Sequence, residues 1–493
     1  MKTSSRASTC RRQSRAGFAL ISVLFVLMAL LILCAPFLGT ARNANEAGAQ
    51  MSDQAQLRLA QDAAGRHARH WLGASHPAID PSLDWDSPEE LTVRTDFDPA
   101  FLDAHDATGL MWDVEVADEA GRIDLNSASP EVIANMLGLA TLLTDVVEPK
   151  DVEIPVGSTR GFGPEGYLVI GGEIIHYGAI EGSRFMSCTR GLGASYDEDD
   201  QPLPGPLPPI SHAIGAPVLD QRTFALPLWR LSGPGHELRQ LDAPEQVLEA
   251  EPFIVAGEQE EQGQFTGEEL ERLFELGSVH AGVTGGRLWQ HPMRLSTPVI
   301  GGETNRIGVS EPRWLSTGAT IRIRDERSTE FAIVTAVSER GFLLDRLLEY
   351  DRHAFDAEVS VLAKRPVNLN TASPEVLRVL FENLKLAGRN ARILSTQANR
   401  LAAQVVAMRP FEGWQDFLVR LVLPAAGLAP PPETAQDEQF DPFLSSADAL
   451  ALYANGQNAN DSTLQFATLP YAFVSREVYD LELRASINGK SGV

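Results

Sequence analysis

Residues 15–38 read RAGFALISVLFVLMALLILCAPFL, and this stretch decides how the fold begins. Gly17 is followed by an almost unbroken apolar run of 21 residues, from Phe18 to Leu38. About 20 apolar residues are enough for a helix to span a bilayer. Basic residues stay on the cytoplasmic side, so we expect a single-pass inner-membrane helix with the bulk of the chain in the periplasm. The basic residues before the run, with no acidic residue among them, are Lys2, Arg6, Arg11, Arg12 and Arg15.

The junction between Gly17 and Phe18 indicates how this segment is processed. No small-x-small cleavage site follows the apolar run, so the segment lacks the pattern of an ordinary secretory signal. A plain N-terminal signal-anchor is one open reading. The other is a resemblance: the junction is similar to a type IV prepilin signal, which a dedicated prepilin peptidase cuts after the glycine. Phe18 would then be the first residue, and the run would remain as anchor and assembly helix.

Charge and cysteine content exclude several classes of protein. The formal net charge is −25, and loss of the five leader cations would make it −25 − 5 = −30. A polyanion repels phosphate backbones, so we do not expect nucleic acid as a partner. Cys10, Cys34 and Cys188 offer neither a disulfide nor metal-ligand spacing. The chain must therefore be stabilised by ordinary hydrophobic cores.

Helical periodicity continues beyond the apolar run. Residues 41–72 carry apolar side chains at helical spacing, so 18–72 should form one helix that ends at Gly73, with Pro36 as a candidate kink. Residues 110–126 contain two segments of alternating apolar and polar residues with a turn signal between them, which predicts a β-hairpin.

One eleven-residue segment occurs twice. Residues 123–133 (IDLNSASPEVI) and 367–377 (VNLNTASPEVL) match at seven of eleven positions. Each copy predicts a strand end, an asparagine, and a helix that starts with a serine cap, a proline in the first turn and a glutamate at the positive end of the helix dipole. The candidate residues of these two corners are Asn126, Ser129, Pro130, Glu131, Asn370, Ser373, Pro374 and Glu375.

The second copy continues into two more helical segments. Residues 397–408 and 415–423 have helical patterns, with Arg409-Pro410 between them. Two short helices behind such a corner resemble the helix-hairpin-helix module. The first copy stops near residue 143, and its missing part is expected at 241–248 and 267–276.

Two β-rich inserts lie between the corners. Residues 154–219 and 297–362 each contain short strands separated by turn signals, and they end alike in HAIGAPV (212–218) and HAFDAEV (353–359). We interpret them as two copies of one small β-barrel or β-roll. Residues 478–487 predict a closing strand, but only four residues follow its Asn488-Gly489 turn, so either the natural protein is longer or this strand pairs elsewhere.

These features together resemble the K-type minor pseudopilins of type II secretion, the general secretion pathway protein K family. The resemblance rests on the leader, the long helix, the two corners and Arg409-Pro410, and it does not cover 139–364. It implies a large helical domain inserted into a pilin-like fold. Most pseudopilins have glutamate at the fifth mature position, whereas this chain has Ser22. The K-type subunit typically lacks that glutamate, which suits a filament tip, because an unpaired carboxylate in a bilayer is costly.

The expected fold class is α+β, with a transmembrane and assembly helix, a pilin-like antiparallel sheet, an inserted helix-hairpin-helix-like domain and two β-rich inserts. The expected segments are the leader (1–17), the N-terminal helix (18–73), the hairpin with the start of the first helical unit (74–138), β insert 1 (154–219), a helical segment (239–280), β insert 2 (297–362), the second helical unit (365–423), a linker (424–445) and a C-terminal β segment (446–493).

The resemblance implies a minor pseudopilin that initiates or caps the periplasmic pseudopilus and assists protein export across the outer membrane. Its implied partners are other minor pseudopilins, the major pseudopilin, prepilin peptidase, and a secreted substrate or the outer-membrane channel. The alternative is a membrane-anchored DNA-uptake protein that uses helix-hairpin-helix units. Arg389, Arg392 and Arg400 keep that alternative open.

Candidate chemical sites are few. Residues 197–200 (DEDD) could hold calcium, since oxygen-rich loops suit that ion, but we favour a solvated acidic loop. K-type pseudopilins are known for calcium in the inserted region, but no ligand can be matched here. His176, His212 and His353 have no acid–base partner at fixed spacing, and no nucleophile elbow, phosphate loop or zinc spacing is present, so we do not expect an enzyme.

Overall fold

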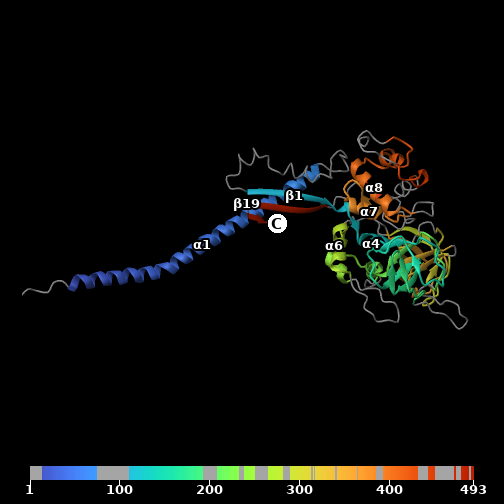
Figure 1. The fold of residues 1–493 in the computed structure, drawn as a ribbon, viewed down its shortest axis with the longest axis horizontal. Helices are drawn as coiled ribbons and strands as arrows, with labels where there is room; N and C mark the ends of the chain where they lie inside the picture. The colour runs from blue at the N-terminus through green and yellow to red at the C-terminus, as the bar shows by residue number, and fades with distance from the viewer. Residues whose placement is uncertain are drawn as a thin grey trace, which may run out of the picture. The chain divides into compact units, whose positions relative to one another are not determined.

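The computed structural model describes residues 14–74, 110–192, 208–231, 238–249, 265–280, 289–311, 315, 317–338, 341–362, 365–384, 392–430, 442–449, 471–473, 479–487 and 490–492. The protein is α+β, with one long N-terminal apolar helix and several antiparallel sheets (Figure 1). Its contacts define two compact units. The anchor unit comprises 1–73, 91–115 and 481–493, and the main unit comprises 74–90 and 116–480.

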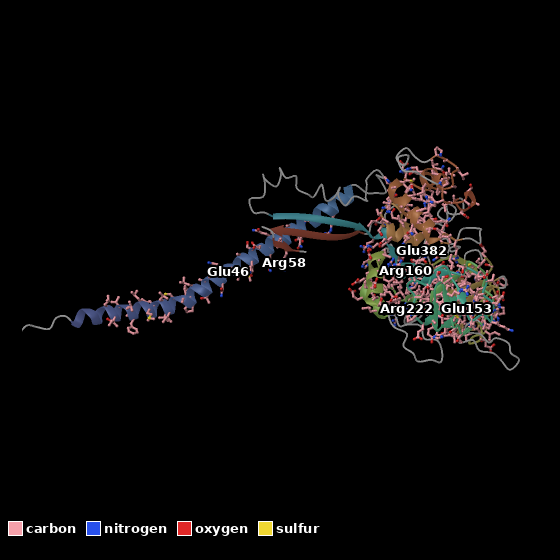
Figure 2. All side chains as sticks on the ribbon, in the orientation of Figure 1. Glu46, Arg58, Glu153, Arg160, Arg222 and Glu382 are labelled. Atoms are coloured by element: carbon pink, nitrogen blue, oxygen red, sulfur yellow. The ribbon has the colours of Figure 1, made fainter. Side chains whose placement is uncertain are left out.

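The anchor unit is built on helix α1 (Ser14–Ala74), which runs through Pro36 and ends one residue after Gly73. A proline inside a helix lacks an N–H and disturbs the preceding turn. Here the Thr40 hydroxyl donates to the carbonyl oxygens of Pro36 at 2.7 Å and Phe37 at 3.0 Å, which satisfies backbone groups around the proline. Side chains project from the middle part of α1, with Glu46 and Arg58 in its charged second half (Figure 2).

The first and last strands of the described chain share a sheet. Strand β19 (Tyr479–Ile487) lies between β1 (Leu110–Asp118) and β20 (Lys490–Gly492). The prediction of a hairpin within 110–126 is therefore wrong, because β1 pairs with a strand that lies far away in the sequence. The prediction of a missing return strand is also wrong, because β20 pairs with the end of β19, with Ile487 opposite Lys490.

The helices of the main unit form two repeats, each of which begins and ends with short strands paired in parallel. The first repeat contains β2 (Ile123–Asp124), α4 (Pro130–Leu137), the 3-10 helix η2 (Gln221–Phe224), α5 (Ala225–Leu231), the 3-10 helix η4 (Pro244–Glu249), α6 (Gly267–Leu276) and β10 (Gly277–Ser278). The second repeat contains β17 (Val367–Asn368), α7 (Pro374–Phe381), α8 (Ser395–Met408), α9 (Trp414–Phe417), the π-helical η6 (Leu418–Val422), α10 (Leu423–Ala425) and β18 (Tyr471–Ala472).

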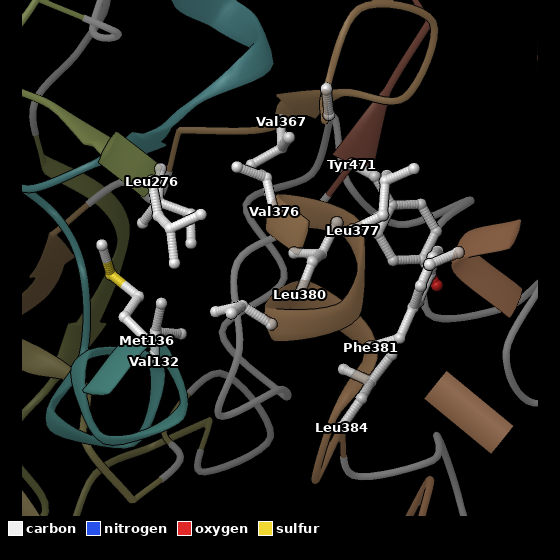
Figure 3. Close-up of a cluster of buried hydrophobic side chains, with 14 of the residues drawn as sticks. Val132, Met136, Leu276, Val367, Val376, Leu377, Leu380, Phe381, Leu384 and Tyr471 are labelled. Atoms are coloured by element: carbon white, nitrogen blue, oxygen red, sulfur yellow. The ribbon is translucent and has the colours of Figure 1, made fainter. Parts of the chain in front are cut away.

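Both repeats bury their apolar faces in one core. Val132 and Met136 of α4 lie in the same buried cluster as Val376 and Leu380 of α7, together with Leu276 of α6 (Figure 3). Because burial of apolar area is the main stabilising term in folding, this shared core joins the two repeats into one body.

Two β modules interrupt the helical repeats. Module 1 lies between α4 and η2 and contains β3 (Ala140–Leu142), β4 (Ile154–Pro155), β5 (Gly166–Ile170), β6 (Glu173–Tyr177), β7 (Ala179–Glu181), β8 (Arg184–Met186) and β9 (Pro217–Asp220). Module 2 lies between the repeats and contains β11 (Trp289–Arg294), β12 (Arg306–Ile307), β13 (Thr320–Arg324), β14 (Thr329–Ser338), β15 (Gly341–Leu344) and β16 (Glu358–Leu362).

The two modules share one order of strand pairing. Module 1 pairs β3-β9-β5-β6 and β7-β8-β4, and module 2 pairs β11-β16-β13-β14-β15-β12, so that β14 occupies the places of both β6 and β7. Isolated bridges repeat as well: Leu143–Val156 corresponds to Leu295–Val309, and Val147–His212 corresponds to Val299–Arg352. These bridges make His212 equivalent to Arg352. The sequence similarity alone would align His212 with His353, the next residue.

Module 1 rests closely on the end of α4. Gly138 caps that helix with φ 71°, and a Cβ on Gly161, whose φ is +94°, would lie only 2.5 Å from the Gly138 oxygen. Positive φ favours glycine at Gly138, and Gly161 needs glycine for a second reason, because a side chain there has no room.

Replacement of Gly161 by alanine should destabilise the protein by about 3 kcal/mol, because backbone strain adds to a clash with a carbonyl oxygen. Gly182 is the matched control: it has φ +59° but nothing within 4 Å of its Cβ position, so Gly182→Ala should cost only about 1 kcal/mol. Calorimetry of both variants in detergent micelles measures the difference. Equal losses would contradict the close approach of the two segments.

Candidate functional site

The apolar part of α1 has little protein cover in the described structure. Leu20, Leu31 and Phe37 are 72%, 72% and 75% exposed. Large contiguous apolar surfaces are rare on soluble proteins and mark contact with another molecule or a membrane. This helix is long and apolar enough to span a membrane.

The predicted processing residues lie on this helix. Gly17 and Phe18 lie within the first turns of α1, and Ser22 follows on its apolar part. Residues 1–13 of the predicted leader lie outside the described residues. The Gly17–Phe18 bond therefore lies inside α1, at the point where the sequence changes from basic to apolar residues.

In the second repeat, Asn370 holds the corner between β17 and α7. Its Oδ1 accepts a hydrogen bond from the Phe411 N–H at 2.8 Å, and its Nδ2 donates to the carbonyl oxygens of Phe411 at 2.9 Å and Phe473 at 3.0 Å. The Asn370 N–H in turn donates to Oδ1 of Asn368 at 3.1 Å. One amide side chain thus joins three segments of the chain.

Asn126 makes the same contacts in the first repeat. Its Oδ1 accepts from the Leu241 N–H at 2.7 Å, and its Nδ2 donates to the carbonyl oxygens of Leu241 and Val279, both at 3.0 Å. Its own N–H donates to Oδ1 of Asp124 at 3.0 Å. Leu241 therefore corresponds to Phe411, and Val279 to Phe473, although the sequence shows no similarity there.

The other predicted corner residues lie at the two helix starts. Ser129 Oγ accepts from the Val132 N–H at 3.4 Å, and Ser373 Oγ accepts from the Val376 N–H at 3.2 Å. Pro130 and Pro374 are the first helical residues. Glu375 is exposed at the positive end of α7, whereas Glu131 is buried at the start of α4. Each helix start thus satisfies a backbone N–H that no helical carbonyl can reach.

Two arginines complete the corners; the sequence analysis missed Arg230 and noted Arg409 without giving it this role. Arg230 donates to the carbonyl oxygens of Leu125 at 3.0 Å and Ala128 at 2.6 Å. Arg409 donates to the equivalent carbonyls, of Leu369 at 2.8 Å and of Ala372. Burial lowers the pKa of Arg230 to about 10. No local signal indicates this role, because Arg230 lies in α5 and Arg409 directly follows α8, and both are far along the chain from the carbonyls that they bind.

A polar cluster links the two repeats inside their shared core. The Asn135 Nδ2 donates to the backbone carbonyl oxygen of Glu382 at 2.7 Å, and the Asn135 Oδ1 accepts from Nδ2 of Asn383 at 2.8 Å. Arg392 forms an ion pair with the buried Glu131 and donates to the backbone carbonyl oxygen of Asn383 at 2.6 Å. Buried polar groups are stable only when they are hydrogen-bonded, so this cluster fixes how the repeats pack.

These contacts weaken the case for a nucleic-acid clamp. Of the three candidate cations, Arg392 is engaged with Glu131, and Arg400 lies over the Phe443 ring at 4.9 Å. Arg389 lies outside the described residues. Arg392 thus supports the protein's own structure, whereas Arg400 remains exposed.

The described residues offer little for metal binding. They contain no group of three or more His, Cys, Asp or Glu side chains that could hold a metal ion. The predicted calcium candidate, residues 197–200, lies outside the described part of the chain. His176 contacts Tyr167 through its ring, with a centroid distance of 5.0 Å, and His353 is exposed on a turn.

Each β module is held by a buried glutamate at an equivalent position. In module 1, Glu173 Oε1 and Oε2 accept from Arg190 at 2.7 and 2.8 Å, and Oε2 lies 2.7 Å from Nε2 of His212. In module 2, Glu330 accepts from Arg352, the equivalent of His212. Burial acts to raise the pKa of Glu173, but the hydrogen bonds from His212 and Arg190 outweigh it and hold that pKa below its ordinary value.

The chain matches no protein-family model, no curated protein and no solved structure. Its function must therefore be argued from its own residues and geometry.

Replacement of Asn370 or Asn126 by alanine should lower the free energy of unfolding by about 3 kcal/mol, because three backbone groups lose their partner at once. Unfolding in urea can be followed by tryptophan fluorescence, since Trp229 lies in the shared core and Trp414 packs against it. The exposed Asn45 of α1 is the control, and its replacement by alanine should change little. Losses below about 0.5 kcal/mol at both corners would contradict the proposed role of the amide.

Glu173 should make module 1 sensitive to acid. Its folded pKa lies below its unfolded pKa of about 4.3, so its stabilising contribution is present above pH 4.3 and is lost as the pH falls through the folded pKa. Glu173→Gln should therefore unfold more easily at pH 7 and show a shallower decline below pH 4.3. Thermal unfolding between pH 7 and pH 3 measures this, with the exposed Glu181→Gln as control. Parallel profiles for wild type and Glu173→Gln would contradict it.

Proposed function

We propose that this chain is a minor pseudopilin of the K type, at the tip of a type II secretion pseudopilus. The observation that carries the proposal is the pairing of β1 with β19. All of the helical repeats and β modules lie between these two strands in the sequence, and α1 precedes them. A long N-terminal helix, a sheet made by the first and last strands, and a large insertion between them are what the resemblance implies.

The anchor helix supports the same proposal. An exposed apolar segment that continues into a charged helix suits a subunit that waits in the inner membrane and is then drawn into a filament. Ser22 leaves the apolar segment without the usual carboxylate. A tip subunit has no subunit above it whose amine needs that charge, so the serine costs it nothing.

The role of the main unit follows from its rigidity and size. The corners and the polar cluster bind the repeats into one body. The corner asparagines use their hydrogen-bonding groups to bind the backbone of other segments of the same chain. In the proposed role this body stands on the filament in the periplasm, prevents further addition at the tip, and meets the secreted substrate or the outer-membrane channel. Other minor pseudopilins and the major pseudopilin are the partners of the anchor helix.

The alternative function is DNA uptake. It needs exposed cations at the helical repeats. Arg392 is paired with the buried Glu131, whereas Arg400 is exposed and lies over the Phe443 ring. The full chain in detergent should show no retention on DNA at low salt. Salt-sensitive retention would favour the alternative and contradict the tip role.

Processing after Gly17 is the direct test of the proposed function. The intact mass of the protein, isolated from membranes of its native host, should correspond to a chain that begins at Phe18. Gly17→Val should leave the precursor uncut, because the peptidase requires the glycine, while Ala16→Ser serves as the matched control and should be cut normally. A product that still begins at Met1, or one that is cut beyond Leu38, would contradict the proposal.

A further inference from the structure

Module 2 carries an exposed aromatic residue in a backbone conformation that disfavours it. Phe355 has φ 70° and is 61% exposed. The Asp356 N–H donates to the His353 oxygen at 3.3 Å, which makes 353–356 a β-turn with Phe355 in its third position. A type II turn needs positive φ at this position, and glycine or asparagine normally occupies it. Phenylalanine is therefore an unusual choice here.

Module 1 has the same turn with glycine at that position. The Ala216 N–H donates to the Ala213 oxygen at 3.1 Å, and Gly215, the third residue, has φ 77°. The equivalent bridges, Val147–His212 and Val299–Arg352, precede the two turns at the same point in each module. The fold itself thus needs no side chain at this position.

The strain at Phe355 has no compensation inside the described structure. A bulky L-residue at positive φ is a steric outlier. Burial of the side chain could offset that strain, but Phe355 is 61% exposed. Strain that is retained without a gain in packing indicates that the side chain serves function.

The base of the turn is rigid. The Arg352 side chain is fully buried, pairs with Glu330, donates to Ser328 Oγ at 2.9 Å and lies 3.3 Å from Asp325. The Phe355 N–H donates to the Leu295 oxygen at 2.6 Å. An aromatic side chain presented on a fixed base loses little freedom on binding, which favours its use as an anchor.

The surface near Phe355 combines apolar and acidic side chains. Asp351 lies two residues before the turn and Asp356 is its last residue, and both are exposed. The adjoining loop presents Ile300, which is 54% exposed, and Glu303, and it is tied to the turn by a hydrogen bond of 2.8 Å from the Gly301 N–H to Asp351. Carboxylates beside an aromatic ring attract lysine and arginine through ion pairs and cation–π contacts, and they repel anionic lipids.

We propose that the Phe355 turn is a docking site for a basic, amphipathic segment of a partner protein. Apolar residues of that segment pack on Phe355 and Ile300, and its lysine or arginine side chains meet Asp351, Asp356 and Glu303. This site belongs to module 2, which lies outside the region that the pseudopilin resemblance covers, so it does not depend on the proposed function.

A peptide selection tests the proposal on the full chain in detergent micelles. A random 12-residue library displayed on phage should yield peptides that combine apolar residues with lysine or arginine. A synthetic peptide of the enriched sequence should bind Phe355→Gly at least about tenfold more weakly by fluorescence anisotropy. Asp351→Asn with Asp356→Asn should weaken binding and reduce its salt dependence. Val337→Ser, which removes a 51% exposed apolar residue from β14 of the same module, should bind as the wild type does.

The melting temperature separates binding from folding. Phe355→Gly should melt at or above the wild-type temperature, because glycine relieves the strain that Gly215 avoids in module 1. Phe355→Ala should lose binding in the same way. Equal peptide affinity of the wild type and both Phe355 variants would overturn the proposal. Enrichment of acidic or neutral peptides, or no enrichment at all, would also overturn it. Enrichment of peptides that match sequences of this chain would overturn it too, because it would indicate that the occupant is a second copy.

Discussion

One side-chain amide in each helical repeat holds together segments that are otherwise distant in the chain. Asn126 binds the backbone of Leu241 and Val279, and Asn370 binds that of Phe411 and Phe473. An asparagine can accept and donate at once, so it satisfies N–H and carbonyl groups that no regular helix or sheet reaches. A buried backbone group without a partner costs about as much as a lost hydrogen bond, and the asparagine satisfies three of them. The helix starts, the parallel strand pairs and the arginines Arg230 and Arg409 all assemble around this amide.

Strand pairing at the two ends of an insertion allows this chain to carry large insertions. Module 1 leaves the first repeat at β3 and returns at β9, and these strands pair with each other, with Ala140 opposite Leu219. The two ends of the module are therefore neighbours, and the repeat closes as if nothing had been inserted. At a larger scale, the chain between β1 and β19 is enclosed by a strand pair in the same way. Paired strands at the ends of an insertion explain how a small fold can carry a body several times its own size.

Local features of this fold could be predicted from the sequence, and distant pairings could not. The Ser-Pro-Glu runs indicate where α4 and α7 begin, because capping depends on residues within one turn. The apolar run indicates the anchor helix, because the length and hydropathy of the run are also local properties of the sequence. The hairpin within 110–126 was predicted wrongly, because alternation marks a strand but does not name its partner. Arg230 lies more than 100 residues from the carbonyls that it binds, and the glycine at position 215 and the phenylalanine at position 355 become equivalent only through the strand bridges. Two candidate features, the acidic loop 197–200 and Arg389, lie outside the described residues.

One proposed role at a filament tip fits three features of this chain: a helix that is long and apolar enough to span a membrane, a sheet that contains the first and last described strands, and a rigid inserted body. The central claim is that this chain works in a complex of similar subunits. The most direct measurement is purification of the full chain, tagged at its C-terminus, from native membranes after mild cross-linking, with identification of the bound proteins by mass spectrometry. We expect recovery of other proteins that have a basic leader, a glycine junction and an apolar N-terminal helix. Recovery of the chain alone, or with nucleic acid in place of such proteins, would contradict it.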